Sequence, residues 1–278
     1  MGELLFCCPL CGGALTRQEH RAVCPQGHSF DVARQGYVHL LPVNKMHSKL
    51  PGDSREMVEG RRRFLEAGYY APFRQELCRL AAACASQLGS PAGEGLLLCD
   101  AGCGEGYYTA GLREALPQAR VCGFDISKLA VKAAAGKYKS VEFGVASSFA
   151  IPLGEASVHL LTDVFSPLAA EEFARVVKPG GFFLYAVPGE RHLYGLKELL
   201  YENPYENPHR ETEYPGFRFV GRTAVRGEIR APDSQTAVDL FTMTPYYWKT
   251  GPQAAQRLET VEGFSTEIGF DFLLYQRQ

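Results

Sequence analysis

The sequence of 278 residues has no apolar run long enough to cross a bilayer, which takes about 20 residues. Its N-terminus also lacks the basic and then apolar order of a secretory signal. A strong net charge is missing as well, because the formal charge is −2 and the pI is near 6.4. We therefore expect a cytoplasmic protein without membrane contact. It cannot hold a nucleic acid by overall basicity, so any such contact must come from local patches.

Nine cysteines in a reducing compartment favour metal ligands or small core residues over disulfides, and the odd number argues against a fully paired framework. Four residues near the N-terminus are paired by spacing. Cys8-x2-Cys11 is followed, after twelve residues, by Cys24-x3-His28. Two close pairs of such ligands are typical of a structural zinc site. All four positions are filled by protein, which predicts one structural Zn²⁺ and leaves no place for a reacting water. Cys7 adjoins the first ligand and could replace Cys8, but Cys8 matches the Cys-Pro frame of the second pair.

The zinc pattern also defines the domain organisation that we expect. A segment of about 40 residues buries too little apolar surface to fold alone, so the metal is expected to fold a zinc-ribbon β domain over residues 1–43. Its final strand is predicted within 28–42, "HSFDVARQGYVHLLP". Residues 44–72 read as a basic linker that runs into a helix, with Asp53 or Ser54 as the N-cap. Residues 73–278 form the remaining domain.

Strands alternate with helices in the second domain, beginning with a helix after Pro72. The alternation at this spacing predicts an α/β fold with a parallel, doubly wound sheet. The five strands are expected at 95–102, 120–127, 141–147, 157–165 and 182–188.

A glycine-rich loop lies where the first of these strands turns into a helix, which is the anion-binding end of such a sheet. The dinucleotide fingerprint is absent because Tyr107 stands where its third glycine would be, and no Gly-Lys-Ser/Thr of a Walker loop follows. What the loop does have is Asp100 at the strand end and then Gly102-x-Gly104. A second acidic strand end follows at Asp125.

This ordered set resembles the S-adenosylmethionine site of class I methyltransferases, which have a Rossmann-like fold. The resemblance implies that Gly102 and Gly104 let the backbone approach the methionine part of the cofactor. It also implies that Asp100 favours the positive end of the cofactor. Asp125, with Ile126 beside it, would bind the ribose.

Two further segments bear on this resemblance. The turn "KPGG" at 178–181, before the fifth strand, is another marker of the family. Many relatives carry an acidic residue after the third strand, where this chain has Ser147 and Ser148. We expect a cofactor contact from one of these two serines.

A zinc module joined through a basic linker to such a domain resembles the 23S rRNA (guanine-N1)-methyltransferases. The resemblance covers nearly the whole chain through "CPLC", "CPQGH", "PGDS.EM", "CGEGYYT", "ARVVKPGG", "PG.RHL" and "MTP..W". It implies a homodimeric enzyme that transfers a methyl group from S-adenosylmethionine to N1 of a guanine in a hairpin loop of 23S rRNA, hairpin 35 in that family. It implies cofactor contacts by Tyr70, Gly104, Glu105 and His192, and a zinc module that takes part in recognising the RNA.

Methylation of guanine N1 requires the loss of a weakly acidic proton, and much of the acceleration can come from proximity and orientation. A carboxylate near N1 or a cation near O6 would assist. Asp163 follows the fourth strand, and Arg191 and His192 follow the fifth, so these three are candidate catalytic residues. The sequence leaves the general base unassigned, and it leaves open which of the neighbouring guanines is methylated and whether antibiotic response changes.

Contacts with RNA are expected from two modestly basic segments, 44–76 and 209–230. The first is concentrated at Arg61, Arg62 and Arg63. The aromatic segment 244–249, "TPYYWK", could stack on an unpaired base, although packing in the core or in a dimer is the favoured interpretation. Two alternative functions stay open, a small-molecule methyltransferase that uses the same cofactor and a non-catalytic adapter that binds cofactor and RNA.

Overall fold

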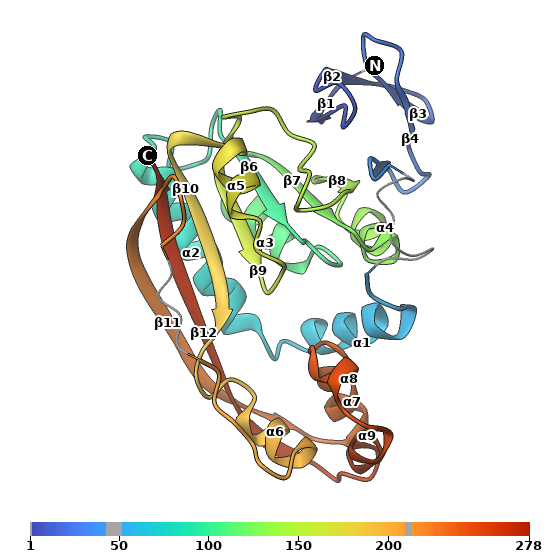
Figure 1. Ribbon diagram of the computed structural model, residues 1–278, viewed down its shortest axis with the longest axis vertical. Coiled ribbons are helices and arrows are strands. Elements are labelled where there is room, and N and C mark those ends of the chain that lie inside the picture. The colour runs from blue at the N-terminus through green and yellow to red at the C-terminus, as the bar shows by residue number, and fades with distance from the viewer. Residues whose placement is uncertain (1, 43–51, 209–212) are drawn as a thin grey trace.

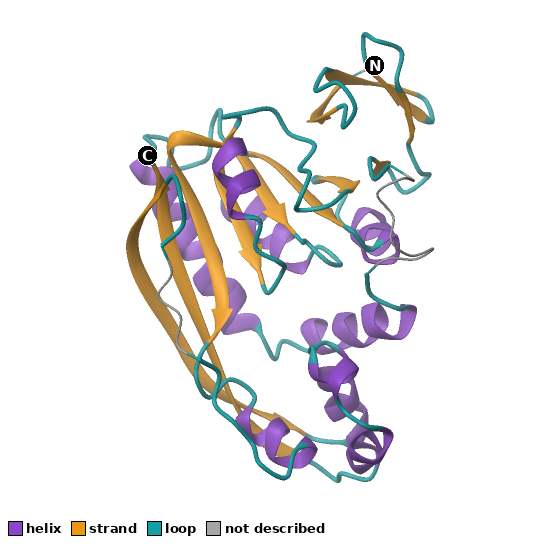
Figure 2. Cartoon of the chain, in the orientation of Figure 1, coloured by secondary structure: helices purple, strands orange, loops and turns teal. Residues whose placement is uncertain are grey.

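The computed structural model describes residues 2–42, 52–208 and 213–278. Residue 43, the first part of the predicted linker segment, 44–51, and four residues of the second basic segment, 209–212, lie outside the described residues. Figures 1 and 2 show a small sheet near the N-terminus beside a larger sheet with helices around it. Among the described residues, no helix has the length and apolar character needed to span a membrane.

The small sheet is antiparallel, and its order follows the chain. The turns after its first and third strands carry the two pairs of predicted zinc ligands. Gly12 and Gly27 adopt left-handed backbone conformations in these turns, with φ of 72° and 83°. The predicted small β domain is confirmed, with strands β1 (Glu3–Cys7), β2 (Ala14–Gln18), β3 (Arg21–Val23) and β4 (Ser29–Asp31).

The segment 28–42 does not serve only the small domain. Its first part is β4, but β5 (Val38–His39) pairs in parallel with β8 (Glu142–Val145) of the large sheet. The predicted final strand of the small domain is therefore present as β4, whereas the pairing of β5 with the large sheet was not predicted. The backbone pairing continues at Leu40, whose N–H donates to the Val145 carbonyl over 2.9 Å.

Phe6 attaches the small sheet to the large one at the same edge. Its ring is fully buried and lies against Gly144 of β8. A Cβ at Gly144 would come within 3.1 Å of that ring. The backbone N–H of Leu5 donates to the Glu142 carboxylate over 2.7 Å, so the two sheets share both apolar and polar contacts.

The large sheet has the order β11-β12-β10-β9-β6-β7-β8-β5. All five predicted strands are present and parallel to one another. Two antiparallel strands that were not predicted extend the sheet, which is therefore mixed. The strands not yet bounded are β6 (Leu97–Ala101), β7 (Arg120–Asp125), β9 (Val158–Val164), β10 (Val177–Pro188), β11 (Phe217–Ala231) and β12 (Phe264–Arg277).

Helices cover both faces of the sheet, as a doubly wound fold requires. Phe73 of α2 stacks on Phe272 at 4.8 Å on one face. Phe173 of α5 packs on Phe183 at 5.1 Å on the other. The helices around the sheet are α2 (Ala71–Gln87), α3 (Tyr107–Ala115), α4 (Lys128–Lys137) and α5 (Ala170–Val176), and α6 (Tyr194–Leu200) contacts β12.

Four more helices form what we call the helical cap, which lies on the side of the sheet to which the parallel strands point (Figure 1). Ser54 caps the first of them, as predicted, because its Oγ accepts from the Met57 N–H over 3.3 Å. Arg63 donates to both carboxylate oxygens of Asp239 and so joins the first cap helix to the second. The cap helices are α1 (Arg55–Glu66), α7 (Ser234–Thr242), α8 (Tyr246–Lys249) and α9 (Pro252–Glu259).

Candidate active site and zinc centre

The four predicted zinc ligands come together in one cluster. The ligand atoms of Cys8, Cys11, Cys24 and His28 all lie within 4.8 Å of one another. The His28 Nδ1 atom is 3.5 Å from the Cys8 Sγ and 3.4 Å from the Cys24 Sγ, and the Cys11 and Cys24 sulfurs are 3.6 Å apart. A tetrahedral zinc ion with its usual bond lengths separates such ligand atoms by roughly 3.5–3.8 Å. The geometry fits a closed, structural Zn²⁺ site, and Cys7 is not part of it.

A cavity of about 350 Å³ opens at the carboxyl ends of β6, β7 and β9. Residues from the loop after β9 and from the helical cap complete its walls, including Phe165, Ser166 and Met243. The cavity is hereafter called the cofactor pocket. Six of the residues predicted to bind the cofactor line it, namely Tyr70, Gly102, Gly104, Glu105, Asp125 and Ile126.

Asp125 ends β7 at the edge of this pocket, and two backbone groups fix its carboxylate. The Gly104 N–H donates to Oδ2 over 2.9 Å, and the Ser127 N–H donates to Oδ1 over 2.7 Å. Burial raises the pKa of Asp125, while these two hydrogen bonds and the nearby Arg61 lower it. A carboxylate held in this way can still accept hydrogen bonds from a pair of hydroxyls.

Gly102 brings the loop after β6 very close to the loop after β9. Its φ is 73°, and a Cβ added there would lie 2.3 Å from the Cβ and Oγ of Ser166. Ser166 is itself fixed, since its Oγ donates to the Ala101 carbonyl over 3.1 Å. Only glycine satisfies both the backbone angle and this approach.

Two of the predicted cofactor residues do not line the pocket. Asp100 is buried beneath the loop and accepts hydrogen bonds from the hydroxyls of Thr109 and Thr162 over 2.6 and 2.8 Å. Burial raises the pKa of Asp100 to about 6, although the two hydrogen bonds act to lower it. It ties β6 to α3 and β9, so this geometry gives it a supporting position rather than a direct contact with the cofactor.

His192 also lies one layer behind the pocket. Its ring centroid is 5.7 Å from that of Phe165 and 6.2 Å from that of Tyr70, and both of those rings line the pocket. Its Nδ1 accepts from the Gly269 N–H over 3.3 Å, which places the ring proton on Nε2. His192 can therefore present a hydrogen-bond donor near the pocket while it remains buried.

The other two catalytic candidates differ sharply in exposure. Asp163 is fully buried, burial raises its pKa to about 8, and its Oδ2 has no hydrogen-bond partner among the described residues. Arg191 lies at the surface and donates to Glu267 and Glu206 over 2.6 and 3.1 Å. Neither lines the cofactor pocket.

The three arginines expected to bind RNA do not form one patch. Arg61 pairs with Asp53 and lines the cofactor pocket, where its charge also acts on Asp125 and Glu105. Arg62 pairs with Glu66 at the surface. Arg63 is the residue that joins the first two cap helices. Contact of these arginines with RNA stays a prediction.

Several lining residues were not found from the sequence. Phe165 and Ser166 follow Asp163, so their place after the fourth strand was a usable signal. Met243 follows α7 of the helical cap, far along the chain from the other lining residues, and no sequence motif pointed to it. Conversely, Ser147 and Ser148 are not among the residues that line the pocket, although a contact was expected there.

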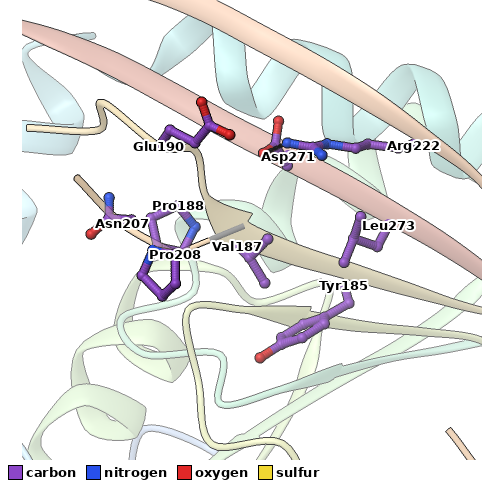
Figure 3. Close-up of a pocket in the computed structure, with 9 residues that line it drawn as sticks. All are labelled: Tyr185, Val187, Pro188, Glu190, Asn207, Pro208, Arg222, Asp271 and Leu273. Atoms are coloured by element: carbon purple, nitrogen blue, oxygen red, sulfur yellow. Dashed lines mark hydrogen bonds and ion pairs between the residues drawn. The ribbon is translucent and has the colours of Figure 1, made fainter. Parts of the chain in front are cut away.

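A separate hollow of about 260 Å³ lies beside β10 and β12 (Figure 3). Tyr185 and Leu273, which face each other across those strands, help to line it. They alternate with Leu184 and Phe272, which belong to the core around α2. The hollow therefore lies on the face of the sheet opposite to α2, and none of the predicted cofactor residues lines it.

The fold and the cofactor pocket define a class I, S-adenosylmethionine-dependent methyltransferase that carries a zinc ribbon. The family described as "RlmA, N-terminal" matches residues 6–49, and the family described as "Methyltransferase domain" matches residues 98–181. A Micromonospora griseorubida protein named as a 23S rRNA (guanine-N1)-methyltransferase is 34% identical over 88% of this chain and 87% of its own. The 23S rRNA (guanine(748)-N1)-methyltransferase of Streptomyces fradiae is 31% identical over 92% and 90%. The chain belongs to the 23S rRNA (guanine-N1)-methyltransferase family.

Arg61 and Arg62 are adjacent in the chain, but only Arg61 lines the cofactor pocket. Substituting each of them in turn therefore tests the effect of the Arg61 charge on ligand binding. Arg61→Met removes the cation that faces three carboxyl groups at the pocket, so the pKa of Asp125 should rise, and a ligand that depends on its ionised carboxylate should bind less well. We expect the dissociation constant for S-adenosylhomocysteine to rise about tenfold, since hydrogen bonds to charged groups contribute about 1.5–3 kcal/mol. Isothermal titration measures it. Arg62→Met, one residue along the same helix, is the control and should leave the affinity unchanged. Equal effects of the two substitutions would contradict this assignment.

Proposed function

We propose that the protein transfers a methyl group from S-adenosylmethionine to N1 of a guanine in the loop of hairpin 35 of 23S rRNA. The observation that carries the proposal is the presence, in one chain, of a pocket with Asp125 at its edge and a closed zinc site too saturated for catalysis. The names of the curated relatives support the same substrate. Guanine 748, which the Streptomyces relative's name specifies, is the first position to examine.

The cofactor supplies a methyl group on a positively charged sulfur. In this proposal Asp125 accepts hydrogen bonds from the ribose hydroxyls, with Ile126 beside it, and the backbone at Gly102 and Gly104 approaches the methionine part. Tyr70 is buried, and burial raises the pKa of its hydroxyl, so the ring stays neutral. A neutral aromatic ring that lines the pocket can stabilise the sulfonium by a cation–π contact.

His192 is the catalytic candidate that the geometry favours. Burial lowers its pKa to about 3, and the positive charges of Lys197 and Arg226 act in the same direction, so the imidazole is neutral. A neutral Nε2–H can donate to guanine O6 and stabilise the negative charge that develops as N1 loses its proton. Asp163 is protonated at neutral pH and Arg191 is held in surface ion pairs, so neither accepts that proton. In this proposal the N1 proton passes to solvent water, N1 forms the bond to the methyl carbon, and the carbon–sulfur bond breaks to leave S-adenosylhomocysteine. Orientation of the base supplies the rest of the acceleration.

The protonated state of Asp163 has a consequence for stability. The pKa of Asp163 is about 8 in the folded protein against an ordinary value of 3.8, so between these pH values the folded chain holds one proton more than the unfolded chain. Its contribution to the free energy of unfolding is therefore complete below pH 3.8 and is lost as the pH rises through about 8. Asparagine at this position does not ionise, so Asp163→Asn should not lose stability as the pH rises. We therefore expect the Tm of this variant to exceed that of the wild type above pH 8.

Thermal melts between pH 5 and 9 measure this difference, which should narrow as the pH falls. Asp233→Asn is the control, because Asp233 is an exposed N-cap whose pKa is lowered by the Thr236 N–H. It should show no gain above pH 8. Parallel Tm curves for the wild type and Asp163→Asn would contradict a protonated Asp163.

Three further features belong to the proposal. The zinc ribbon takes part in RNA recognition, the enzyme acts as a homodimer, and it works in the cytoplasm. We propose domain limits of 1–43 for the zinc ribbon, 44–72 for the linker and first helix, and 73–278 for the methyltransferase domain. Sedimentation equilibrium tests the dimer, since a single species of 30.6 kDa at micromolar concentration would contradict it.

Transfer of a tritiated methyl group to rRNA that lacks the modification tests the function. Label in the rRNA, together with a primer-extension stop in hairpin 35, is the expected result because an N1-methyl blocks base pairing. Asp125→Ala should abolish the label. Cofactor binding without label in rRNA would favour a non-catalytic adapter, and label in a small molecule alone would favour the other alternative.

A further inference from the structure

The three aromatic residues of α8 do not share one environment. Tyr246 is buried, with its ring 6.0 Å from Tyr201 and nearly perpendicular to it. The buried ammonium of Lys197 lies 5.7 Å from the same ring. Trp248, by contrast, is 68% exposed. From the sequence we favoured packing of this segment in the core or in a dimer; the exposure excludes core packing for Trp248, and dimer packing stays a prediction.

The position of the exposed indole is fixed by its neighbours. In a helix, residues two positions apart point to nearly opposite sides, so anchoring Tyr246 inward turns Trp248 outward. The Trp248 ring meets Tyr247 edge to face at 5.0 Å, and Tyr247 in turn packs on Phe241 of α7 at 5.6 Å. A large aromatic face is thus exposed on a supported helix and not on a loose loop.

The same helix follows a residue of the cofactor pocket closely along the chain and carries a positive charge. Met243, three residues before α8, lines the pocket. Lys249, next to Trp248, is exposed, and no ion pair or hydrogen bond of its side chain is found within the described ranges. Proteins bind unpaired nucleic acid by combining aromatic faces for the bases with cations for the phosphates. Trp248 and Lys249 provide that combination five and six residues along the chain from Met243 of the cofactor pocket.

We propose that Trp248 is a stacking platform for an unpaired base of the rRNA loop, next to the guanine that is methylated. The inference rests on the proposed function for the identity of the RNA. The competing occupant is a second copy of the chain, which would cover the indole in a dimer.

Trp248 is the only tryptophan in the sequence, so its fluorescence reports on this site alone. We expect an unmodified hairpin 35 fragment to quench the emission and to protect it from acrylamide. A fully paired RNA of the same length should bind more weakly and give no protection. The signal is corrected for absorption by RNA with free N-acetyltryptophanamide. RNA binding without protection, or no binding at all, would overturn the proposal. Protection that grows with protein concentration in the absence of RNA would overturn it in favour of a dimer interface.

Two substitutions separate stacking from folding. Trp248→Ala should raise the dissociation constant for the hairpin about tenfold, as expected for one lost base–aromatic stack. Trp248→Phe keeps a ring and should recover most of that affinity. Both should bind S-adenosylhomocysteine as the wild type does, which shows that the fold is intact. Unchanged RNA affinity in Trp248→Ala would overturn the platform. Loss of methyl transfer in the wild type with protection intact would instead count against the proposed function.

Discussion

Gly102→Ala is expected to abolish detectable cofactor binding although it adds a single carbon atom. The new Cβ would lie 2.3 Å from two atoms of Ser166, and the φ of 73° disfavours any L side chain by about 1–2 kcal/mol. Ser166 cannot retreat without loss, because its N–H donates to Asp163 over 3.0 Å and its Oγ donates to Ala101. The loop after β9 must therefore move, and with it the wall that Phe165 provides.

Isothermal titration with S-adenosylhomocysteine measures the dissociation constant, which should rise roughly 100-fold or more, a loss of about 2.8 kcal/mol of binding free energy. Gly180→Ala is the matched control, because φ is 79° there and a Cβ would meet nothing within 4 Å. It should bind the cofactor normally. Adding Ser166→Gly to Gly102→Ala removes both clashing atoms and should restore part of the affinity. A normal dissociation constant for Gly102→Ala alone would refute the close approach of the two loops.

The parallel half of the sheet could be predicted because its strands are buried on both faces. Such strands appear in the sequence as short apolar runs that end in turn residues, as at 95–102 and 182–188. The zinc site could be predicted equally well, because its ligands form two pairs whose members lie close together along the chain. Both predictions needed only residues that are neighbours along the chain.

The antiparallel half was hidden by its charges. β11 contains several arginines, so the segment 209–230 was interpreted from the sequence as a basic segment. In the structure Arg222 and Arg226 both pair with Asp271 of β12, some 45–49 residues away. The charge of the segment is partly neutralised across the sheet, and a count along the chain could not show that.

Side-chain direction on the helices was the other missing information. Adjacent helix positions differ by about 100° in direction, so Arg61 reaches the cofactor pocket while Arg62 reaches solvent. The same rotation buries Tyr246 and exposes Trp248. A run of similar residues in the sequence does not show which of them faces a pocket, because that depends on how the helix packs against its neighbours.

Cys24→Ala is expected to release the zinc ion and unfold the zinc ribbon while the cofactor pocket stays competent. The cluster loses one of four ligands, and structural zinc contributes on the order of 10 kcal/mol to the folding of comparable small domains. No residue of the described ribbon strands lines the cofactor pocket. The affinity for S-adenosylhomocysteine should therefore change little, whereas the affinity for the hairpin 35 fragment should fall at least about tenfold if the ribbon recognises RNA.

Cys7→Ala is the control for this experiment, because Cys7 adjoins the first ligand but lies outside the cluster. It should keep one zinc ion per chain, as measured by metal analysis, and should bind both ligands normally. Loss of the ribbon would also uncover Phe6 and the edge of β8, so the Tm of Cys24→Ala should fall. If Cys24→Ala loses zinc and still binds the hairpin with the wild-type affinity, the ribbon has no part in recognition. The RNA must then be held by the methyltransferase domain alone, with Trp248 and Lys249 as the first residues to examine.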